Sequence, residues 1–444
     1  MRLSVGHYVF LGLFVVVQCV IIAFLLTLTG VDYYRLKRIH NLINAGFLMV
    51  LGSIFIWKRV TAALNYLDPD RITPARLRWR TICFQDVARA SLLILLVLSQ
   101  FSMIFYFLLL GTEPHILAQI SLVGLAAYLH VIVFLVIAEC LHFFSTLFLN
   151  YGVLESMNRY IVDNRHAFIF VSLCCALLFI LGGLYTTITD PVYTHVTIHL
   201  EKLRQGELRV ALLSDLHIGP TVGQKRMEKI AQITNELNPD VITIAGDLAD
   251  GYVRDFAVAA TPLCSLKAKY GVYFATGNHE YMHGNIEEWF AFLENCNITV
   301  LHNSYKRFVT KKGGHFCIAG ADDLYAAKAH FPGHAMQPER AVSGCALNDT
   351  TIMLAHQPNA AKLMLSHPLV SEKLDLILSG HTHGGQMYLF VPIIYLANAF
   401  ARGLYYHEAT NVYVYVSAGV NFFGPPVKMF GGCEIIDILL KPLT

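Results

Sequence analysis

Residues 208–217, Leu-Arg-Val-Ala-Leu-Leu-Ser-Asp-Leu-His, decide the fold of this chain, because a short apolar run ends there at a carboxylate and an imidazole. The run 241–245 ends in the same way at Gly246-Asp247, and the run 272–275 leads to Gly277-Asn278-His279-Glu280. Apolar runs of this length, bounded by glycine and polar residues, predict buried strands. Apolar residues at helical spacing in 224–237 make the order strand, helix, strand.

The spacing of these segments predicts a parallel sheet. Asp215 and Asp247 are 32 positions apart, and Asp247 and Asn278 are 31 positions apart. One strand–helix–strand unit takes about 30 residues. Each candidate side chain should therefore leave the same carboxyl-terminal edge, where open α/β sheets bind their ligands. Further runs that predict strands lie at 192–200, 316–319, 351–354, 374–378 and 412–416.

Two of the later runs bring more candidate ligands to this edge. His356 follows the first of them, and His381 and His383 follow the second. Carboxylates, imidazoles and amides are ligands of divalent cations, and a pair of such ions can hydrolyse phosphate esters. Alternation in an extended backbone would point Asp215 and His217 the same way, and His381 and His383 likewise.

Five blocks of this sequence resemble the calcineurin-like metallophosphoesterases, in that family's order, over about residues 195–444. The blocks are Ser214-Asp215-Leu216-His217-Ile218-Gly219, Gly246-Asp247-Leu248, Gly277-Asn278-His279-Glu280, Ala355-His356-Gln357-Pro358 and Gly380-His381-Thr382-His383-Gly384-Gly385-Gln386. Each block alone is a weak signal, but all five together are specific. The resemblance implies a four-layer α/β/β/α sandwich with two metal ions at the edge of the sheets.

The resemblance also implies a role for each candidate residue. One ion would be bound by Asp215, His217, Asp247 and His383, and the other by Asp247, Asn278, His356 and His381. A hydroxide bridging the ions would attack phosphorus, and His279 would assist the leaving oxygen as a general acid or a stabiliser of the transition state. The ligand set suits Mn, Fe or Zn. Purple acid phosphatases have a tyrosine where Asp250 stands, so an iron–tyrosinate centre is not expected.

The composition divides the chain at about residue 190. The whole chain is 55% hydrophobic and only 14% charged, whereas soluble proteins carry about a quarter charged residues. Of its 33 Lys and Arg residues 13 lie before residue 191, and of its 31 Asp and Glu residues 9 do. Residues 1–190 are therefore predicted to form a membrane domain, and residues 191–444 the metallophosphoesterase domain.

Five apolar stretches in the first part approach or exceed the roughly 20 residues that a membrane-spanning helix needs. They lie at about 8–29, 41–57, 90–110, 116–138 and 167–186. Runs of this length disfavour a buried helical bundle in a soluble protein. The first stretch could instead be a signal peptide, but it is longer than the apolar part of one and no clear cleavage site follows, so an uncleaved anchor is preferred.

The basic residues of the short loops predict the orientation of these helices. Most of them lie between the second and third stretches and between the fourth and fifth, so that side should be cytoplasmic. Residues 191–444 should then face the lumen or the exterior, which agrees with glycosylation-type triplets at Asn297 and Asn348. The five cysteines of that part allow one or two disulfides and leave at least one thiol unpaired.

These observations predict a membrane-anchored phosphoesterase acting on a phosphomonoester, phosphodiester or pyrophosphate bond. The membrane anchor, together with the aromatic residues Tyr405, Tyr406, Phe422 and Phe423, favours a lipid-linked substrate. No basic stripe indicates nucleic-acid binding. Two alternatives stay open. One is a catalytically silent, metal-binding interaction module on a membrane anchor. The other is a transporter or receptor, which the scarcity of charges in the apolar stretches disfavours.

Overall fold

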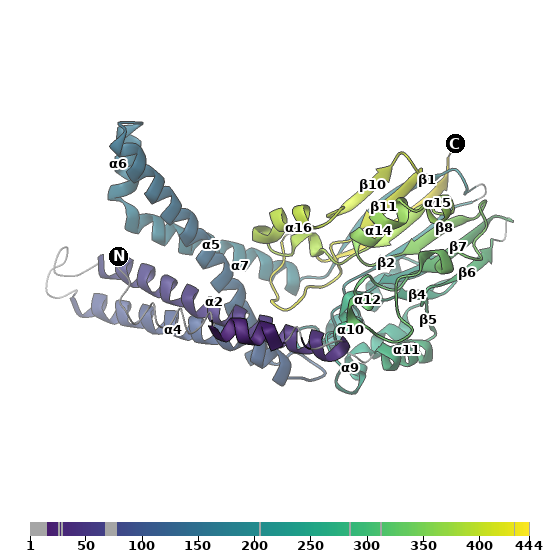
Figure 1. Ribbon diagram of the computed structural model, residues 1–444, viewed down its shortest axis with the longest axis horizontal. Coiled ribbons are helices and arrows are strands. Elements are labelled where there is room, and N and C mark those ends of the chain that lie inside the picture. Colours follow the sequence, from purple (N-terminus) through teal and green to yellow (C-terminus); the bar gives the residue numbers. More distant parts are fainter. Residues whose placement is uncertain are drawn as a thin grey trace.

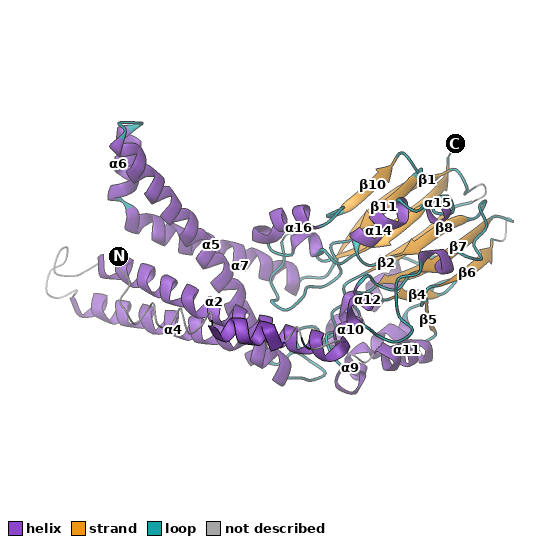
Figure 2. Ribbon diagram, in the orientation of Figure 1, coloured by secondary structure: helices purple, strands orange, loops and turns teal. Residues whose placement is uncertain are grey.

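The computed structural model describes residues 16–24, 27, 30–66, 78–203, 206–283, 286–310, 313–429 and 431–443. Within these ranges a group of long helices precedes a part built from two β-sheets, and the two parts lie at opposite ends of the molecule (Figure 1). Figure 2 shows that the strands are confined to the second part. The predicted fold class, apolar helices followed by an α/β sandwich, is confirmed.

Four helices in the described part of the chain are long and apolar enough to cross a membrane. They are Ile39–Tyr66 within α2 (Gly30–Tyr66), Phe84–Leu108 within α4 (Arg78–Leu108), α5 (Ile116–Asn150) and α7 (Arg165–Ile188), and α6 (Glu155–Asp163) connects the last two. They overlap the last four predicted stretches and extend beyond most of their ends. The first predicted stretch, 8–29, lies outside the described residues except for 16–24 and 27.

One partly buried acidic group links three of these helices at the end away from the sheets. The Glu139 carboxylate on α5 lies 3.1 Å from the guanidinium of Arg59 on α2 and 2.6 Å from that of Arg165 on α7. Two arginines compensate the charge that a lone carboxylate would carry into an apolar environment. This arrangement holds the helices together.

Each sheet has six strands. The first has the order β1 (Val192–Leu200), β12 (Glu434–Pro442), β2 (Leu208–Leu213), β3 (Val241–Ala245), β4 (Val272–Ala275) and β5 (Ile298–Val300). The second has the order β10 (Gly403–His407), β11 (Val412–Val416), β9 (Leu376–Ser379), β8 (Thr350–Leu354), β7 (His315–Gly320) and β6 (Ser304–Val309). Strands β2 to β5 are parallel, as the spacing predicted, and β12 runs antiparallel to β2.

Helices cover the outer faces of both sheets. The first sheet is covered by α8 (Gln224–Glu236), α9 (Val253–Ala260) and α11 (Ile286–Asn295), and the second by α13 (Pro338–Ala341), α14 (Pro358–Leu365) and α15 (Pro368–Ser371). A third core, which includes Leu212, Phe316 and Leu354, fills the space between the sheets. The remaining short elements are α10 (Asn278–His283), α12 (Tyr325–Ala329), α16 (Val391–Ala397), η1 (Thr261–Ser265), η2 (His383–Gly385) and η3 (Tyr388–Phe390).

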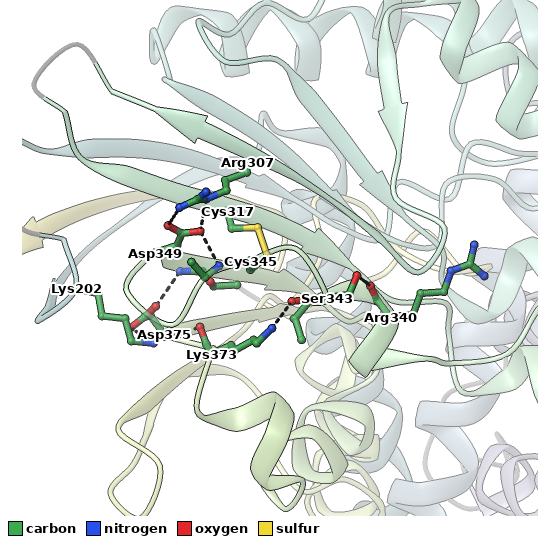
Figure 3. The surroundings of a disulfide bond; sticks show 12 residues. Lys202, Arg307, Cys317, Arg340, Ser343, Cys345, Asp349, Lys373 and Asp375 are labelled. Atoms are coloured by element: carbon green, nitrogen blue, oxygen red, sulfur yellow. Dashed lines mark hydrogen bonds and ion pairs between the residues drawn. A yellow bond between two sulfur atoms is a disulfide. The ribbon is translucent and has the colours of Figure 1, made fainter.

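Two disulfides link separate segments of the sandwich. Cys264 is bonded to Cys296, and Cys317 on β7 to Cys345, which precedes β8. Figure 3 shows the second of these beside an ion pair between Arg307 and Asp349. Cys433 is a free thiol, so the prediction of one or two disulfides with a thiol left over is confirmed.

Candidate metal centre

The loops after five parallel strands bring all eight predicted site residues into one buried cluster. The strands are β2, β3 and β4 of the first sheet and β8 and β9 of the second, and their carboxyl-terminal ends meet at one edge of the sandwich. Three groups of metal-ligating side chains lie there, and each shares a member with another. The groups are Asp215 with His217 and His383, His217 with Asp247 and His279, and Asp247 with His356 and His381.

In one half of the cluster, the ring nitrogens of His217 and His383 lie close to each other and to the Asp215 carboxylate. His217 Nε2 lies 3.0 Å from His383 Nε2, which lies 3.3 Å from Asp215 Oδ1. The other ring nitrogen of His217, Nδ1, lies 2.9 Å from Asp250 Oδ1. Because a proton on Nδ1 is donated to that carboxylate, Nε2 is left with a lone pair directed into the cluster.

The other half surrounds the second oxygen of Asp247. His356 Nε2 lies 3.1 Å from Asp247 Oδ2, and His356 Nδ1 lies 2.7 Å from the carbonyl oxygen of Ala245. The amide oxygen of Asn278 lies 2.8 Å from His381 Nδ1. Asp247 therefore stands between the two halves, where one carboxylate could serve two cations.

The backbone at four of the predicted ligands is left-handed. The extended geometry predicted for the pair Asp215 and His217 and for the pair His381 and His383 is therefore wrong. The φ angles are 53° at Asp215, 44° at His217, 71° at His381 and 50° at His383. Non-glycine residues adopt this region rarely, and such strain concentrates at functional sites. The chain turns sharply as it leaves each strand, and these turns bring both side chains of each pair to the site.

The electrostatics of the cluster favour added positive charge. Asp215, Asp247 and Asp250 are at most 5% exposed, and buried carboxylates are costly unless they are compensated. Burial lowers the pKa of His381 to about 3, with a further contribution from His356, so this imidazole is neutral. His356 Nε2 is buried and faces the Asp247 carboxylate. Neutral imidazoles, carboxylates and an amide oxygen fit divalent cations.

His279 is held beside the centre by Asp250. Its Nδ1 lies 2.7 Å from Asp250 Oδ1, and its Nε2 lies 3.9 Å from Asp247 Oδ2. Burial lowers the pKa of His279, but the carboxylates of Asp247 and Asp250 outweigh burial and raise it to about 9. The imidazole therefore carries a proton at neutral pH, as a general acid requires.

Asp250 also joins the centre to a membrane helix. The hydroxyl of Tyr106, near the end of α4, donates a 2.6 Å hydrogen bond to Asp250 Oδ2. The carboxylate of Asp250 is therefore contacted by the side chains of Tyr106, His217 and His279. In the sequence, Asp250 stood out only because purple acid phosphatases have a tyrosine at this position, and no role was predicted for Tyr106. The contact joins residues 144 positions apart, so no local signal could have predicted it.

Glu280 braces the two loops that deliver Asp247 and Asn278. Its carboxylate accepts hydrogen bonds from the backbone N–H groups of Asp247, Leu248 and Gly277. Burial, together with the charge of Asp247, raises the pKa of Glu280 to about 7. The motif Gly277-Asn278-His279-Glu280 thus contains a positioning carboxylate in addition to the predicted site residues.

The C-terminal loop 421–426 forms part of the rim of the candidate centre. The ring of Phe423 lies 4.8 Å from that of His279 between centroids. The other aromatic residues that suggested a lipid surface lie elsewhere: Phe422 is buried in a core, Tyr405 packs on Phe400 and Tyr406 on Tyr413. Lys428 is fully buried and donates to the carbonyl oxygens of Ala418, Gly419 and Asn421, so it orders this loop.

A fourth group of metal-type side chains lies outside the centre. His302 Nδ1 lies 2.7 Å from Asp322 Oδ1, and His334 Nδ1 lies 3.5 Å from Asp322 Oδ2. The other nitrogen of His334 lies 2.9 Å from Glu287. The cluster of His302, Asp322 and His334 was not predicted from the sequence.

Comparison with known proteins agrees with this geometry. The family model described as calcineurin-like phosphoesterase matches residues 208–385. A Caenorhabditis elegans protein whose name describes it as a metallophosphoesterase is 50% identical over 93% of this chain and 91% of its own length. The Danio rerio transmembrane protein with metallophosphoesterase domain is 36% identical over 91% of this chain and 90% of its own length. Among solved structures, a dimetal phosphatase from Danio rerio matches 48% of this chain and 87% of its own, with 10% identity and a TM-score of 0.32.

Proposed function

Because the chain belongs to the calcineurin-like phosphoesterase family, we propose that it is a membrane-anchored hydrolase of a phosphomonoester, phosphodiester or pyrophosphate bond. Residues 191–444 would be the catalytic unit and residues 1–190 the multi-pass anchor. The observation that carries this proposal is the convergence of eight side chains from five strand ends, seven of them buried and His381 partly buried. A copy that had lost its activity would be expected to lack some of them.

The candidate residues divide the work as follows. Asp215, His217, Asp247 and His383 would hold one divalent ion, and Asp247, Asn278, His356 and His381 the other. When bound, the ions supply positive charge to the phosphoryl oxygens and lower the pKa of a water molecule. Asp250 fixes the orientation of His217 and keeps a proton on His279. His279 would give that proton to the leaving oxygen.

The substrate would be lipid-linked, and the catalytic unit would lie in the lumen or outside the cell. The chain is a membrane protein, and its centre is joined to a membrane helix through Tyr106. Two disulfides support an oxidising compartment. Asn297 and Asn348 are exposed, as glycosylation requires.

Hydrolysis by the full-length protein in detergent tests the activity. With Mn²⁺, Fe²⁺ or Zn²⁺ added separately, wild type should hydrolyse p-nitrophenyl phosphate or its diester. Asp247→Asn should lose at least a hundredfold in kcat, because one neutral amide replaces the shared carboxylate. Glu288→Gln, an exposed substitution on α11, is the matched control. Metal binding by wild type without hydrolysis of any ester would favour the silent interaction module.

Glycosylation in cells tests the orientation. If the catalytic unit is lumenal, an N-glycosidase should increase the gel mobility of wild type. The double variant Asn297→Gln, Asn348→Gln should show no such change. In sealed microsomes, added protease reaches only the cytosolic face of the membrane. Digestion of the C-terminal part there would contradict a lumenal location.

A further inference from the structure

A cavity of about 350 Å³ joins the candidate metal centre to the membrane helices. His381 and His383 line one end of it. Met103 of α4 and Leu125 and Leu129 of α5 line another part. The volume lies in the range of small-molecule binding sites, roughly 300–1,000 Å³. Predicted metal ligands and apolar side chains of two candidate membrane helices therefore face one space.

The cavity extends along the membrane helices. Leu129 is 13 residues beyond Ile116, the first residue of α5, which is about 20 Å along a helix that rises 1.5 Å per residue. Half of a bilayer's hydrocarbon thickness is about 15 Å. Tyr106, which touches Asp250, lies near the end of α4 and lines the same cavity. The α5 residues that line the cavity thus lie well inside this apolar helix, whereas Tyr106 of α4 lies close to the end of its own helix.

The polar groups of the lining are already used within the protein. Thr382 donates its hydroxyl hydrogen to the carbonyl oxygen of Ala401, and the amide of Gln386 bonds to the backbone of Phe423 and Pro425. The cavity away from the metal centre therefore offers mainly apolar contacts. Such a lining suits a hydrocarbon chain and penalises a second charged group.

The segment that closes the cavity on the catalytic side is itself apolar on its outer surface. Ile393, Tyr395 and Leu396 of α16 are 57%, 64% and 88% exposed. The preceding ring of Tyr388 packs on Phe179 of α7, with 5.6 Å between the centroids. Figure 1 shows α16 projecting from the sheets toward the long helices. An apolar surface in this position is suited to contact with lipid.

We propose that this cavity binds the hydrocarbon chain of a membrane phospholipid while its phosphate lies at the metal centre. The inference rests on the proposed function and names the substrate class of that site. The phosphate would face the carboxylates and imidazoles through the bound cations, and the chain would extend between α4, α5 and α16. The lipid could reach the site without leaving the bilayer, because membrane helices form the cavity wall.

Chain-length dependence of inhibition tests this proposal with the full-length protein in detergent and Mn²⁺. Methyl-, butyl- and octylphosphonate, each below its micellar concentration, compete with hydrolysis of p-nitrophenyl phosphate. Each buried methylene contributes to binding, so the inhibition constant should fall at least tenfold from methyl- to octylphosphonate. Leu129→Trp fills the cavity and should remove most of this dependence. Ile137→Trp, on the same helix but 56% exposed, should retain it.

The outcomes separate this inference from the proposed function. Equal inhibition by the three phosphonates, or an unchanged dependence in Leu129→Trp, would overturn the phospholipid site while hydrolysis stands. A dependence lost equally in Ile137→Trp would reflect a general effect of a tryptophan on α5 and would also overturn it. Absence of hydrolysis of every ester by metal-loaded wild type would instead overturn the proposed function, and the inference with it.

Discussion

At the scale of single residues, Asp250 contacts both His217, a proposed metal ligand, and His279, the proposed general acid. Its Oδ1 lies 2.9 Å from Nδ1 of His217 and 2.7 Å from Nδ1 of His279. Asp250→Asn replaces this shared acceptor by a neutral amide, so both rings should lose orientation. Removing such an outer partner costs roughly 10–100-fold in metal affinity or activity. Metal titration by isothermal calorimetry should show the loss, and unchanged affinity and activity would argue against this role.

Gly277 allows the closest approach between two loops of the centre. A Cβ atom there would lie 2.3 Å from Asp247 Oδ1, inside van der Waals contact. Gly277→Ala should therefore displace the shared carboxylate and reduce activity at least a hundredfold. Gly111→Ala is the matched control, because its added Cβ would meet its nearest atom at an ordinary 3.5 Å. Comparable activity in the two variants would contradict the geometry.

The sequence predicted the eight site residues because five short blocks carry them, but it did not predict their supporting contacts. Motif spacing identifies which strand a side chain follows. It does not reveal that Tyr106 reaches Asp250, because that contact depends on how α4 packs against the sandwich. The left-handed turns at Asp215 and His381 also escaped prediction, since aspartate and histidine, although enriched among residues with positive φ, adopt this conformation at only a small minority of positions.

At the scale of elements, Asp437 on β12 links three neighbouring strands. Its oxygens receive two hydrogen bonds from Arg209 on β2, each 2.7 Å, and His195 Nδ1 on β1 lies 2.7 Å from Oδ2. Burial raises the pKa of Asp437, but the hydrogen bonds from Arg209 and His195 outweigh it, so this pKa is lowered. Asp437→Asn should reduce stability by about 1–3 kcal/mol at neutral pH.

The pH dependence of this effect follows from the sign of the shift. A carboxyl group with a depressed folded-state pKa contributes stability that is present above its unfolded pKa, about 3.9. That contribution is lost as the pH falls through the lower folded-state value. The difference in melting temperature between wild type and Asp437→Asn should therefore be constant near neutrality and shrink below about pH 4. A difference that grows at low pH would contradict this assignment.

The disulfide between Cys317 and Cys345 closes a loop across 28 positions that contains the end of β7 and the helices α12 and α13. A loop of this length corresponds to about 3–4 kcal/mol of unfolded-state entropy. Cys317→Ser with Cys345→Ser should lower the melting temperature under oxidising conditions. Cys140→Ser, an exposed thiol on α5, should leave it unchanged. Under reducing conditions, which also break Cys264–Cys296, the double variant and wild type should melt at the same temperature, and a remaining difference would show that the bond does not act through loop closure.

The strands most readily predicted were the central ones. β2, β3 and β8 are continuous apolar runs because helices or a second sheet cover both of their faces. β6 and β10 lie at sheet edges and were not predicted; β6 carries exposed residues on both faces and β10 on one. β5 has only three residues. β12 was missed although it is apolar, because it lies beyond the last motif and joins the first sheet only through distant pairing.

At the scale of the whole molecule, the edge of the sandwich that carries the candidate metal centre faces the long helices. Ala126 of α5, Ile180 of α7, Met387 and Val427 form a buried cluster between the two parts. Composition predicted a membrane part, and the motifs predicted a phosphoesterase part. Neither contains information about which face of the sandwich packs against the long helices. Enclosure of the centre by membrane helices is the feature that directs the proposed function toward lipid substrates.

Diffraction from crystals containing Mn²⁺, recorded for its anomalous signal, tests the central claim most directly. Two peaks should lie on either side of the Asp247 carboxylate, about 3.5–4 Å apart as in other two-metal sites. One should contact Asp215 and His217, and the other His356 and Asn278. No peak, a single peak, or peaks away from these side chains would contradict a two-metal centre.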